Sequence, residues 1–150
     1  MQRPSLSLKG RALRLLSGRE HSRAELERKL AGHEEEPGQL GRILDDLQAK
    51  GFIDEGRVAE SVVHRRAGKL GAMRIRHELH SKGLPDDLVR QTVARLQPSE
   101  LARARDLWRK KFGRPPADAA ERGKQVRFLA SRGFGGETIR RVIEDRAEGD

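Results

Sequence analysis

Cysteine is absent from this chain of 150 residues, and aromatic side chains make up only 3% of it. Without cysteine, structural disulfides, zinc–thiolate sites and cysteine nucleophiles are excluded. No apolar run approaches the roughly 20 residues that a membrane-spanning helix needs, and residues 1–10 hold no apolar segment before a cleavage site, so we expect no secretory signal. We therefore expect a cytoplasmic protein with a thin, aliphatic core.

Positive charge is in excess, because 32 Lys and Arg residues face 23 Asp and Glu residues and give a formal net charge of +9. Such a balance favours phosphate-rich or acidic partners through long-range attraction. Charged residues account for 37% of the chain, a composition that can bury only a thin core and that permits disorder at the ends. Leu, Val, Ile and Ala nevertheless recur at helical spacing through most of the sequence, so we expect a folded chain.

Apolar residues recur every three or four positions from Leu8 to Ile143, which is the spacing of helices that bury one face. Ser22 and Glu25 form a capping-box pattern at a helix start, and Pro85 suits the first turn of another helix. Pro98 is expected to separate two further helices. Apolar and polar residues do not alternate, and Thr and Tyr are scarce or absent, so strands are disfavoured. The sequence predicts nine short helices and an all-α fold.

An internal repeat groups these helices in threes. The apolar pattern around Leu30 recurs 49 residues later at Leu79, and the cap Ser81-Lys82-Gly83-Leu84 recurs 50 residues later as Ser131-Arg132-Gly133-Phe134. This period predicts three tandem three-helix repeats, helix-turn-helix-like units that support one another. The alternative is a chance similarity among leucine- and arginine-rich helices. We place the units at residues 8–51, 54–97 and 99–147, with flexible ends at 1–7 and 148–150.

Motifs for chemistry are mostly missing. No glycine-rich segment ends in the Lys-Ser/Thr of a phosphate-binding loop, and Gly135–Thr138 is a weak anion candidate that is more simply a helix-connecting turn. His77 and His80 could face one metal ion from a helix, but further ligands are missing, so we expect solvated histidines. No nucleophile lies beside a base. We therefore expect a non-enzymatic protein without cofactor or metal, and not a small nuclease, which would need a carboxylate cluster.

The positive signal is a series of basic residues on the predicted helices. Lys and Arg neutralise phosphates and release counterions, or they pair with a carboxylate-rich protein groove; the alternative is that they form ordinary solvated faces. No aromatic residue is interleaved with them at the surface, which gives base stacking little support, and Trp108 and Phe112 are expected in the core. The candidate binding residues are Arg65, Arg66, Lys69, Arg74, Arg76, Arg109, Lys110, Lys111, Arg114, Lys124, Arg127, Arg132, Arg140 and Arg141.

Four segments share the pattern of one family: Ala12–Leu26 near the start, Gly51–Glu60 and Arg65–Gly83 in the middle, and Arg127–Phe134 near the end. In this order they resemble the RecX family, whose middle segment runs Gly, two apolar residues, two acidic residues, any residue, Arg, an aromatic residue and Ala. Val58 departs from this pattern, because the family often has Phe or Tyr there. The departure gives the middle unit a lighter core.

The resemblance implies three tandem units in an elongated, curved, cytoplasmic molecule that binds in the groove of the RecA–DNA filament. There it would limit filament growth, ATP hydrolysis, strand exchange and the SOS co-protease activity. Cations spaced along a rigid monomer would bridge several filament subunits and DNA phosphates at once, with weak non-specific DNA contact. The alternative is a stand-alone helical DNA-binding protein. Its sequence-specific readout gets little support, because Gln91 and Gln125 are the only neutral amides at expected recognition-helix positions.

Overall fold

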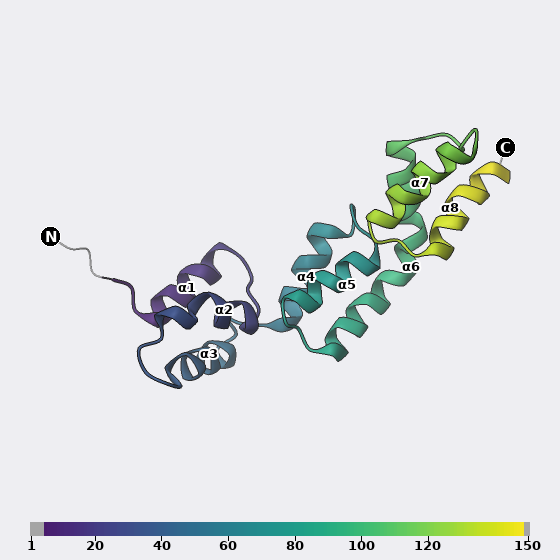
Figure 1. Ribbon diagram of the computed structural model, residues 1–150. Coiled ribbons are helices and arrows are strands. Elements are labelled where there is room, and N and C mark those ends of the chain that lie inside the picture. The colour runs from purple at the N-terminus through teal and green to yellow at the C-terminus, as the bar shows by residue number, and fades with distance from the viewer. Residues whose placement is uncertain (1–4, 149–150) are drawn as a thin grey trace.

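The computed structural model describes residues 5–148, and every regular element in that part of the chain is helical (Figure 1). The predicted all-α fold is confirmed. The predicted capping box is present as well, because the Ser22 hydroxyl accepts from the Glu25 amide at 3.1 Å and Glu25 Oε1 accepts from the Ser22 amide at 3.0 Å. The elements are α1 (Leu8–Gly18), α2 (Arg23–Leu30), the 3-10 turn η1 (Ala31–His33), α3 (Gln39–Ala49), α4 (Glu55–Arg66), α5 (Ala72–Ser81), α6 (Asp86–Lys111), α7 (Ala119–Ser131) and α8 (Gly136–Glu148).

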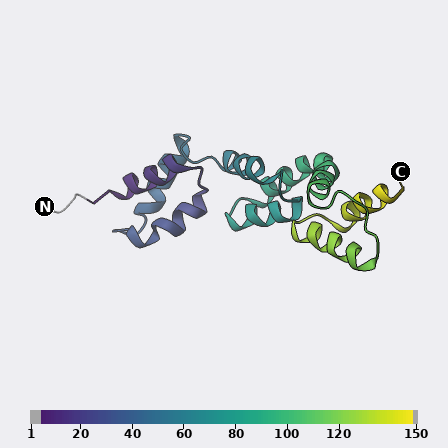
Figure 2. The same ribbon diagram turned by 90° about the horizontal axis from the view of Figure 1, so that it is seen from above.

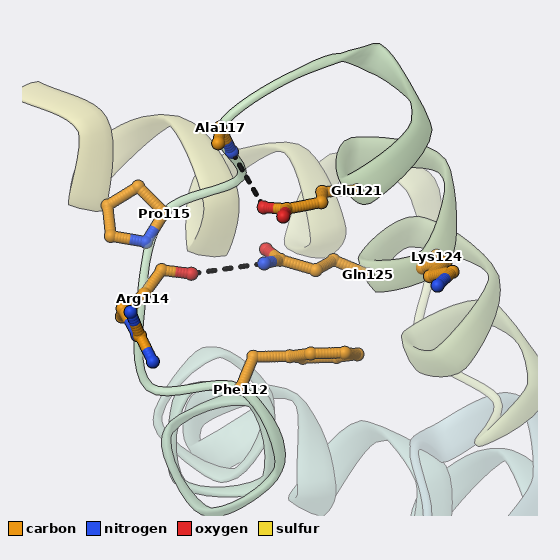
Figure 3. A pocket seen from close by; sticks show the side chains of 7 residues that line it. All are labelled: Phe112, Arg114, Pro115, Ala117, Glu121, Lys124 and Gln125. Atoms are coloured by element: carbon orange, nitrogen blue, oxygen red, sulfur yellow. Dashed lines mark hydrogen bonds between the residues drawn. The ribbon is translucent and has the colours of Figure 1, made fainter.

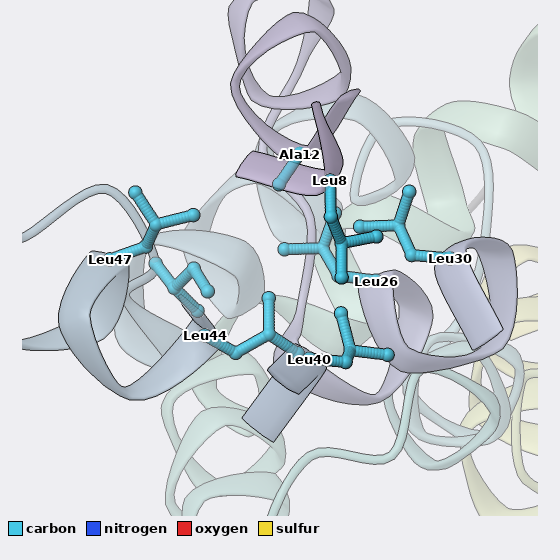
Figure 4. Packing of buried hydrophobic residues seen from close by; sticks show 8 residues of the cluster. Leu8, Ala12, Leu26, Leu30, Leu40, Leu44 and Leu47 are labelled. Atoms are coloured by element: carbon cyan, nitrogen blue, oxygen red, sulfur yellow. The ribbon is translucent and has the colours of Figure 1, made fainter. Parts of the chain in front are cut away.

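These helices form three three-helix units that follow one another along an elongated molecule, which bends so that the third unit rises above the line of the first two in Figure 1 (see also Figure 2). The first unit holds α1 to α3, the second α4, α5 and the first half of α6, and the third the second half of α6 with α7 and α8. Each unit has its own cluster of buried apolar side chains. In the first unit (Figure 4) the cluster consists of Leu8, Ala12, Leu26, Leu30, Leu40, Leu44, Leu47 and Ile53.

One predicted helix boundary is wrong. We expected Pro98 to separate two helices, but α6 runs through it for 26 residues. Proline lacks the amide hydrogen that would complete one helical hydrogen bond, yet the buried face continues across it from Leu96 to Ala104, and α6 packs against both α5 and α8. This packing offsets the lost bond. The predicted division between residues 97 and 99 therefore falls inside a helix that the second and third units share.

The predicted flexible ends, 1–7 and 148–150, lie largely outside the described residues. Ser7 is described, and its hydroxyl accepts from the Gly10 amide at 3.0 Å as the N-cap of α1. Its part in this cap makes Ser7 the start of the first unit and not a free tail.

Neighbouring units meet through their second helices, α2, α5 and α7. At the first junction the Ser22 hydroxyl, just before α2, donates to the Lys82 carbonyl at the end of α5 at 2.5 Å. At the second junction the Gly71 amide, just before α5, donates to the Arg132 carbonyl at the end of α7 at 2.7 Å. The repeated Ser-Lys/Arg-Gly cap therefore docks on the preceding unit at both places.

A carboxylate from the following unit completes each junction. Glu55 Oε1 on α4 accepts from the Arg23 amide at the start of α2 at 3.3 Å. Glu100 Oε1 on α6 accepts from the Ala72 amide at the start of α5 at 3.0 Å. The first amides of a helix have no partner within the helix itself, so the next unit supplies the missing acceptor. A contact that recurs in this way argues against a chance similarity between the units.

Candidate functional site

The second junction gathers several of the predicted basic residues into one surface hollow of about 380 Å³. Arg66 is the last residue of α4, Lys69 lies in the turn that follows it, Arg74 is in the first turn of α5, and Arg132 is the C-cap of α7. Docking of the Arg132–Gly133 cap on α5 brings these four residues together across more than 60 positions of sequence. The hollow thus draws its cations from two units.

Partners inside the hollow divide these cations into two kinds. Arg65 and Arg66 both pair with Glu78, at 3.7 and 3.0 Å, so part of their charge is compensated. Arg74 Nη1 donates to the Ser131 carbonyl at 2.7 Å, a neutral partner that orients the guanidinium and leaves its charge in place. Lys69 is exposed and makes no ion pair with a described residue. Lys69, Arg74 and Arg132 are therefore the members of the hollow that are free to meet an anion.

Phe128 extends this positive surface toward the end of α6. The Arg132 guanidinium carbon lies 5.1 Å from the centre of its ring and Lys111 Nζ lies 5.6 Å from it, distances at which a cation is attracted to an aromatic face. Phe112 meets the same ring edge-on at 5.5 Å. The expectation that no aromatic residue is interleaved with the cations is therefore wrong for Phe128. We call Lys69, Arg74, Arg132 and Lys111 the basic belt.

A second hollow, of about 470 Å³, holds Arg114 and Lys124 beside Phe112 (Figure 3). Gln125 forms its floor, where its Oε1 accepts from the Trp108 indole at 2.8 Å and its Nε2 donates to the Arg114 carbonyl at 3.0 Å. Trp108 is buried, as expected for the core, whereas Phe112 is only half-buried. Because Gln125 is only 4% exposed and its amide is turned to these two internal partners, the side chain is not presented to a base edge.

The remaining predicted residues are spread over the third unit and α5. Arg109 pairs with Asp106 at 3.4 Å, and Arg140 pairs with Glu137 and Glu144 at 2.5 and 2.7 Å, so their charges are largely compensated. Of the predicted residues outside the belt, the exposed cations that line neither hollow and make no ion pair with a described residue are Arg76, Lys110, Arg127 and Arg141. All four members of the belt are among the predicted residues, but the sequence could not separate them from neighbours that are paired with carboxylates.

Sequence reasoning missed the cations of the first unit. Arg11, Arg14 and Lys29 line a third hollow there, and their spacing alone did not set them apart from other surface charges. Among the described residues no three His, Asp or Glu side chains gather closely enough to hold a metal ion. No helix in the same part of the chain is long and apolar enough to cross a membrane.

Comparison with known proteins places this geometry in a family. The chain matches the models of the first, second and third three-helix domains of RecX over residues 9–47, 54–93 and 99–143. It is 57% identical to "Regulatory protein RecX" of Leptothrix cholodnii, over 94% of this chain and 90% of the relative, and 51% identical to that of Ralstonia nicotianae, over 96% and 91%. The crystal structure of RecX from Lactobacillus salivarius superposes with a TM-score of 0.78 at 23% identity, over 94% of this chain and 95% of that one. The chain therefore belongs to the RecX family of regulatory proteins.

Proposed function

We propose that this chain is a non-enzymatic regulator that binds in the groove of the RecA–DNA filament and limits ATP hydrolysis, strand exchange and SOS co-protease activity. The observation that supports the proposal is the basic belt, whose four cations come from two units and have no carboxylate partner among the described residues. Relatives that span nearly the whole chain bear the name of a regulatory protein. We further propose that it acts as a monomer in the cytoplasm.

Multivalency is the physical basis of this proposal. Each exposed cation gains little from one anion in water, but several cations held on a rigid scaffold bind together once the first has engaged. The belt is held rigidly, because backbone hydrogen bonds between α5 and α7 fix the positions of Arg74 and Arg132. An elongated ligand of this kind needs no deep pocket.

The test is the ATPase activity of RecA on single-stranded DNA with this protein added at substoichiometric amounts. A belt variant, Lys69→Glu with Lys111→Glu, should need at least about tenfold more protein for the same inhibition, because two anchor charges are reversed. The matched control is Arg42→Glu with Arg90→Glu, which makes the same change of net charge at exposed residues outside the belt. Circular dichroism checks that both variants keep the helical content of the parent.

The outcomes separate the proposal from its rivals. Inhibition by the parent and the control, but not by the belt variant, supports it. Equal loss of inhibition in the belt variant and the control would mean that only the net charge of the protein matters. Strong binding to bare DNA without any effect on RecA would favour a stand-alone DNA-binding protein, whose affinity should fall steeply with salt.

A further inference from the structure

The first unit holds a hollow of about 600 Å³ between α1, α2 and η1, on a different unit from the basic belt. Its rim is cationic, and no Asp or Glu is among the side chains that line it. The lining residues are Leu6, Arg11, Arg14, Leu15, Gly18, Arg19, His21, Lys29, Leu30 and His33. A rim that carries only positive charge favours an anionic ligand.

The floor of this hollow is apolar and partly open to solvent. Leu6 is 45% exposed, which makes it one of three large apolar side chains with such exposure among the described residues. Leu15 is half-buried beside it, and Leu30 is buried and joins the floor to the core of the unit. An exposed leucine beside a half-buried one gains from being covered by another apolar group.

His21 fixes one of the rim charges without neutralising it. The residue is only 2% exposed, and this burial lowers the pKa of His21, which favours the neutral ring. The neutral ring donates from Nδ1 to the Arg19 carbonyl at 3.1 Å and accepts at Nε2 from the Lys29 ammonium at 3.0 Å. Lys29 is therefore held at the rim by a neutral acceptor, and its charge remains available.

The other cations of the rim differ in their availability. Arg19 pairs with Glu25 at 2.8 Å and so belongs to the scaffold. Arg11 and Arg14, one turn apart on α1, make no ion pair with a described residue. Three cations, Arg11, Arg14 and Lys29, thus surround an apolar floor with no carboxylate of the lining to compensate them.

We propose that this hollow is a docking site for an acidic peptide segment of a partner protein that anchors one apolar side chain between its carboxylates. The cationic rim complements the carboxylates, and the leucine floor takes the anchor. A nucleic acid fits less well, because no aromatic side chain lines the hollow for base stacking and phosphates would leave the leucines uncovered. The site is separate from the basic belt, so the proposal does not depend on binding to RecA.

The test is fluorescence anisotropy with a fluorescein-labelled decapeptide of Asp and Glu around one central Leu. Two further peptides replace the acidic residues by Asn and Gln, or the Leu by Ser. We expect the first peptide to bind at least about tenfold more tightly than either of the others, because each lacks one of the two complementary features. Similar affinity for all three peptides, or no binding of the first, would overturn the proposal.

Variants locate the binding on the protein. Arg14→Glu should lower the affinity for the acidic peptide about tenfold or more. Arg42→Glu, which makes the same change on α3 of the same unit, should leave this affinity unchanged. Leu6→Ser should lower the affinity for the peptide with the central Leu and leave the affinity for the peptide with Ser unchanged. Equal effects of Arg14→Glu and Arg42→Glu would overturn the site. Oligothymidylate that binds tightly and loses affinity in Arg14→Glu, with no peptide bound, would assign the hollow to nucleic acid instead.

Discussion

Glu25 shows how one buried carboxylate can hold a junction. Burial favours its neutral form, but hydrogen bonds from the Arg19 guanidinium and the Ser22 amide, with the charge of Lys82, outweigh burial and lower the pKa of Glu25 from 4.5 to about 2. Lys82 Nζ lies 3.4 Å from Glu25 Oε2, and Lys82 belongs to the second unit. The ionised form therefore stabilises both the first unit and its contact with the second.

Acid should weaken the protein through this residue. Because the pKa of Glu25 is lower in the folded than in the unfolded chain, its contribution is complete above pH 4.5 and is lost as the pH falls toward about 2. The contribution is on the order of 2 kcal/mol, allowing for the exposure of Arg19. Urea unfolding at pH 7 and pH 3 measures it, and Glu25→Gln should flatten the decline. An equal decline in the variant would contradict this role.

Glu55 should have the opposite dependence on pH. Burial raises the pKa of Glu55, although the Arg23 amide opposes the change, and Glu55 Oε2 is buried without a hydrogen-bond partner among the described residues. The protonated form is thus favoured on folding, so its stabilisation is present below the unfolded pKa and lost as the pH rises through the folded pKa.

We therefore expect Glu55→Gln to be at least as stable as the parent at pH 7, because glutamine can still accept from the Arg23 amide without a buried charge. The difference should shrink at pH 4, where the parent carboxyl is protonated. Urea unfolding at the two pH values measures both free energies. A variant less stable than the parent by more than about 1 kcal/mol at pH 7 would show that the charge itself is needed.

At the scale of elements, α6 is fastened to the loop between α4 and α5 by a pair that follows Pro98. Arg103 Nη1 donates to the Ala67 and Leu70 carbonyls at 2.8 and 2.7 Å, and its Nη2 contacts Glu100 Oε2 at 2.5 Å. The Glu100 side chain is only 7% exposed and also accepts from the Ala72 amide. The pair joins three helices through groups that water does not reach easily.

Removal of Glu100 should be costly. Glu100→Ala leaves the Arg103 guanidinium without a carboxylate partner and the Ala72 amide without an acceptor, and we expect a loss of about 3 kcal/mol. The matched control is Asp106→Ala on the same helix, which breaks the exposed pair with Arg109 and should cost less than about 0.5 kcal/mol. Urea unfolding of both variants gives the two free energies. If both variants lose a similarly small free energy of unfolding, the Glu100–Arg103 pair adds nothing beyond an exposed ion pair.

The same elements show what could be predicted from sequence. The capping box of α2 and the apolar spacing of the helices are local, so their signals lie within a few residues. The passage of α6 through Pro98 is not local, because it depends on packing against α5 and α8. The site also combines local and non-local contacts. Phe128 and Arg132 are one turn apart, so their contact could have been predicted from spacing. Lys111 reaches the same ring only because α6 approaches α7.

At the scale of the whole molecule, the order of the units rests on close backbone contacts. Gly133 has φ +94°, and a Cβ there would lie 2.6 Å from the Arg74 amide nitrogen. Gly71, on the other side of the junction, would place a Cβ 2.5 Å from the Gly133 carbonyl oxygen. Glycine is needed here because two helix ends meet with no room for a side chain between them.

Gly133→Ala should separate the second and third units, with a loss of about 3 kcal/mol from backbone strain and the clash together. Gly51→Ala is the control, because Gly51 has φ +85° but nothing lies within 4 Å of its Cβ position, so it should cost only about 1 kcal/mol of strain. Thermal unfolding compares the two. A control that loses as much as Gly133→Ala would show that the junction tolerates a methyl group.

The caps also give the row of units a direction. The first amides of α5 depend on Glu100 and on the Arg132 and Gly133 carbonyls, which all come from the unit that follows. The corresponding turn of α7 is closed by its own Asp118, which accepts from the Glu121 amide at 2.9 Å. Acceptors for the first amides of α2 and α5 therefore come from the following unit, the second for α2 and the third for α5. Melting of the last unit would expose the first amides of α5, whereas loss of the first unit would remove the donors to the Ser81 and Lys82 carbonyls at the end of α5.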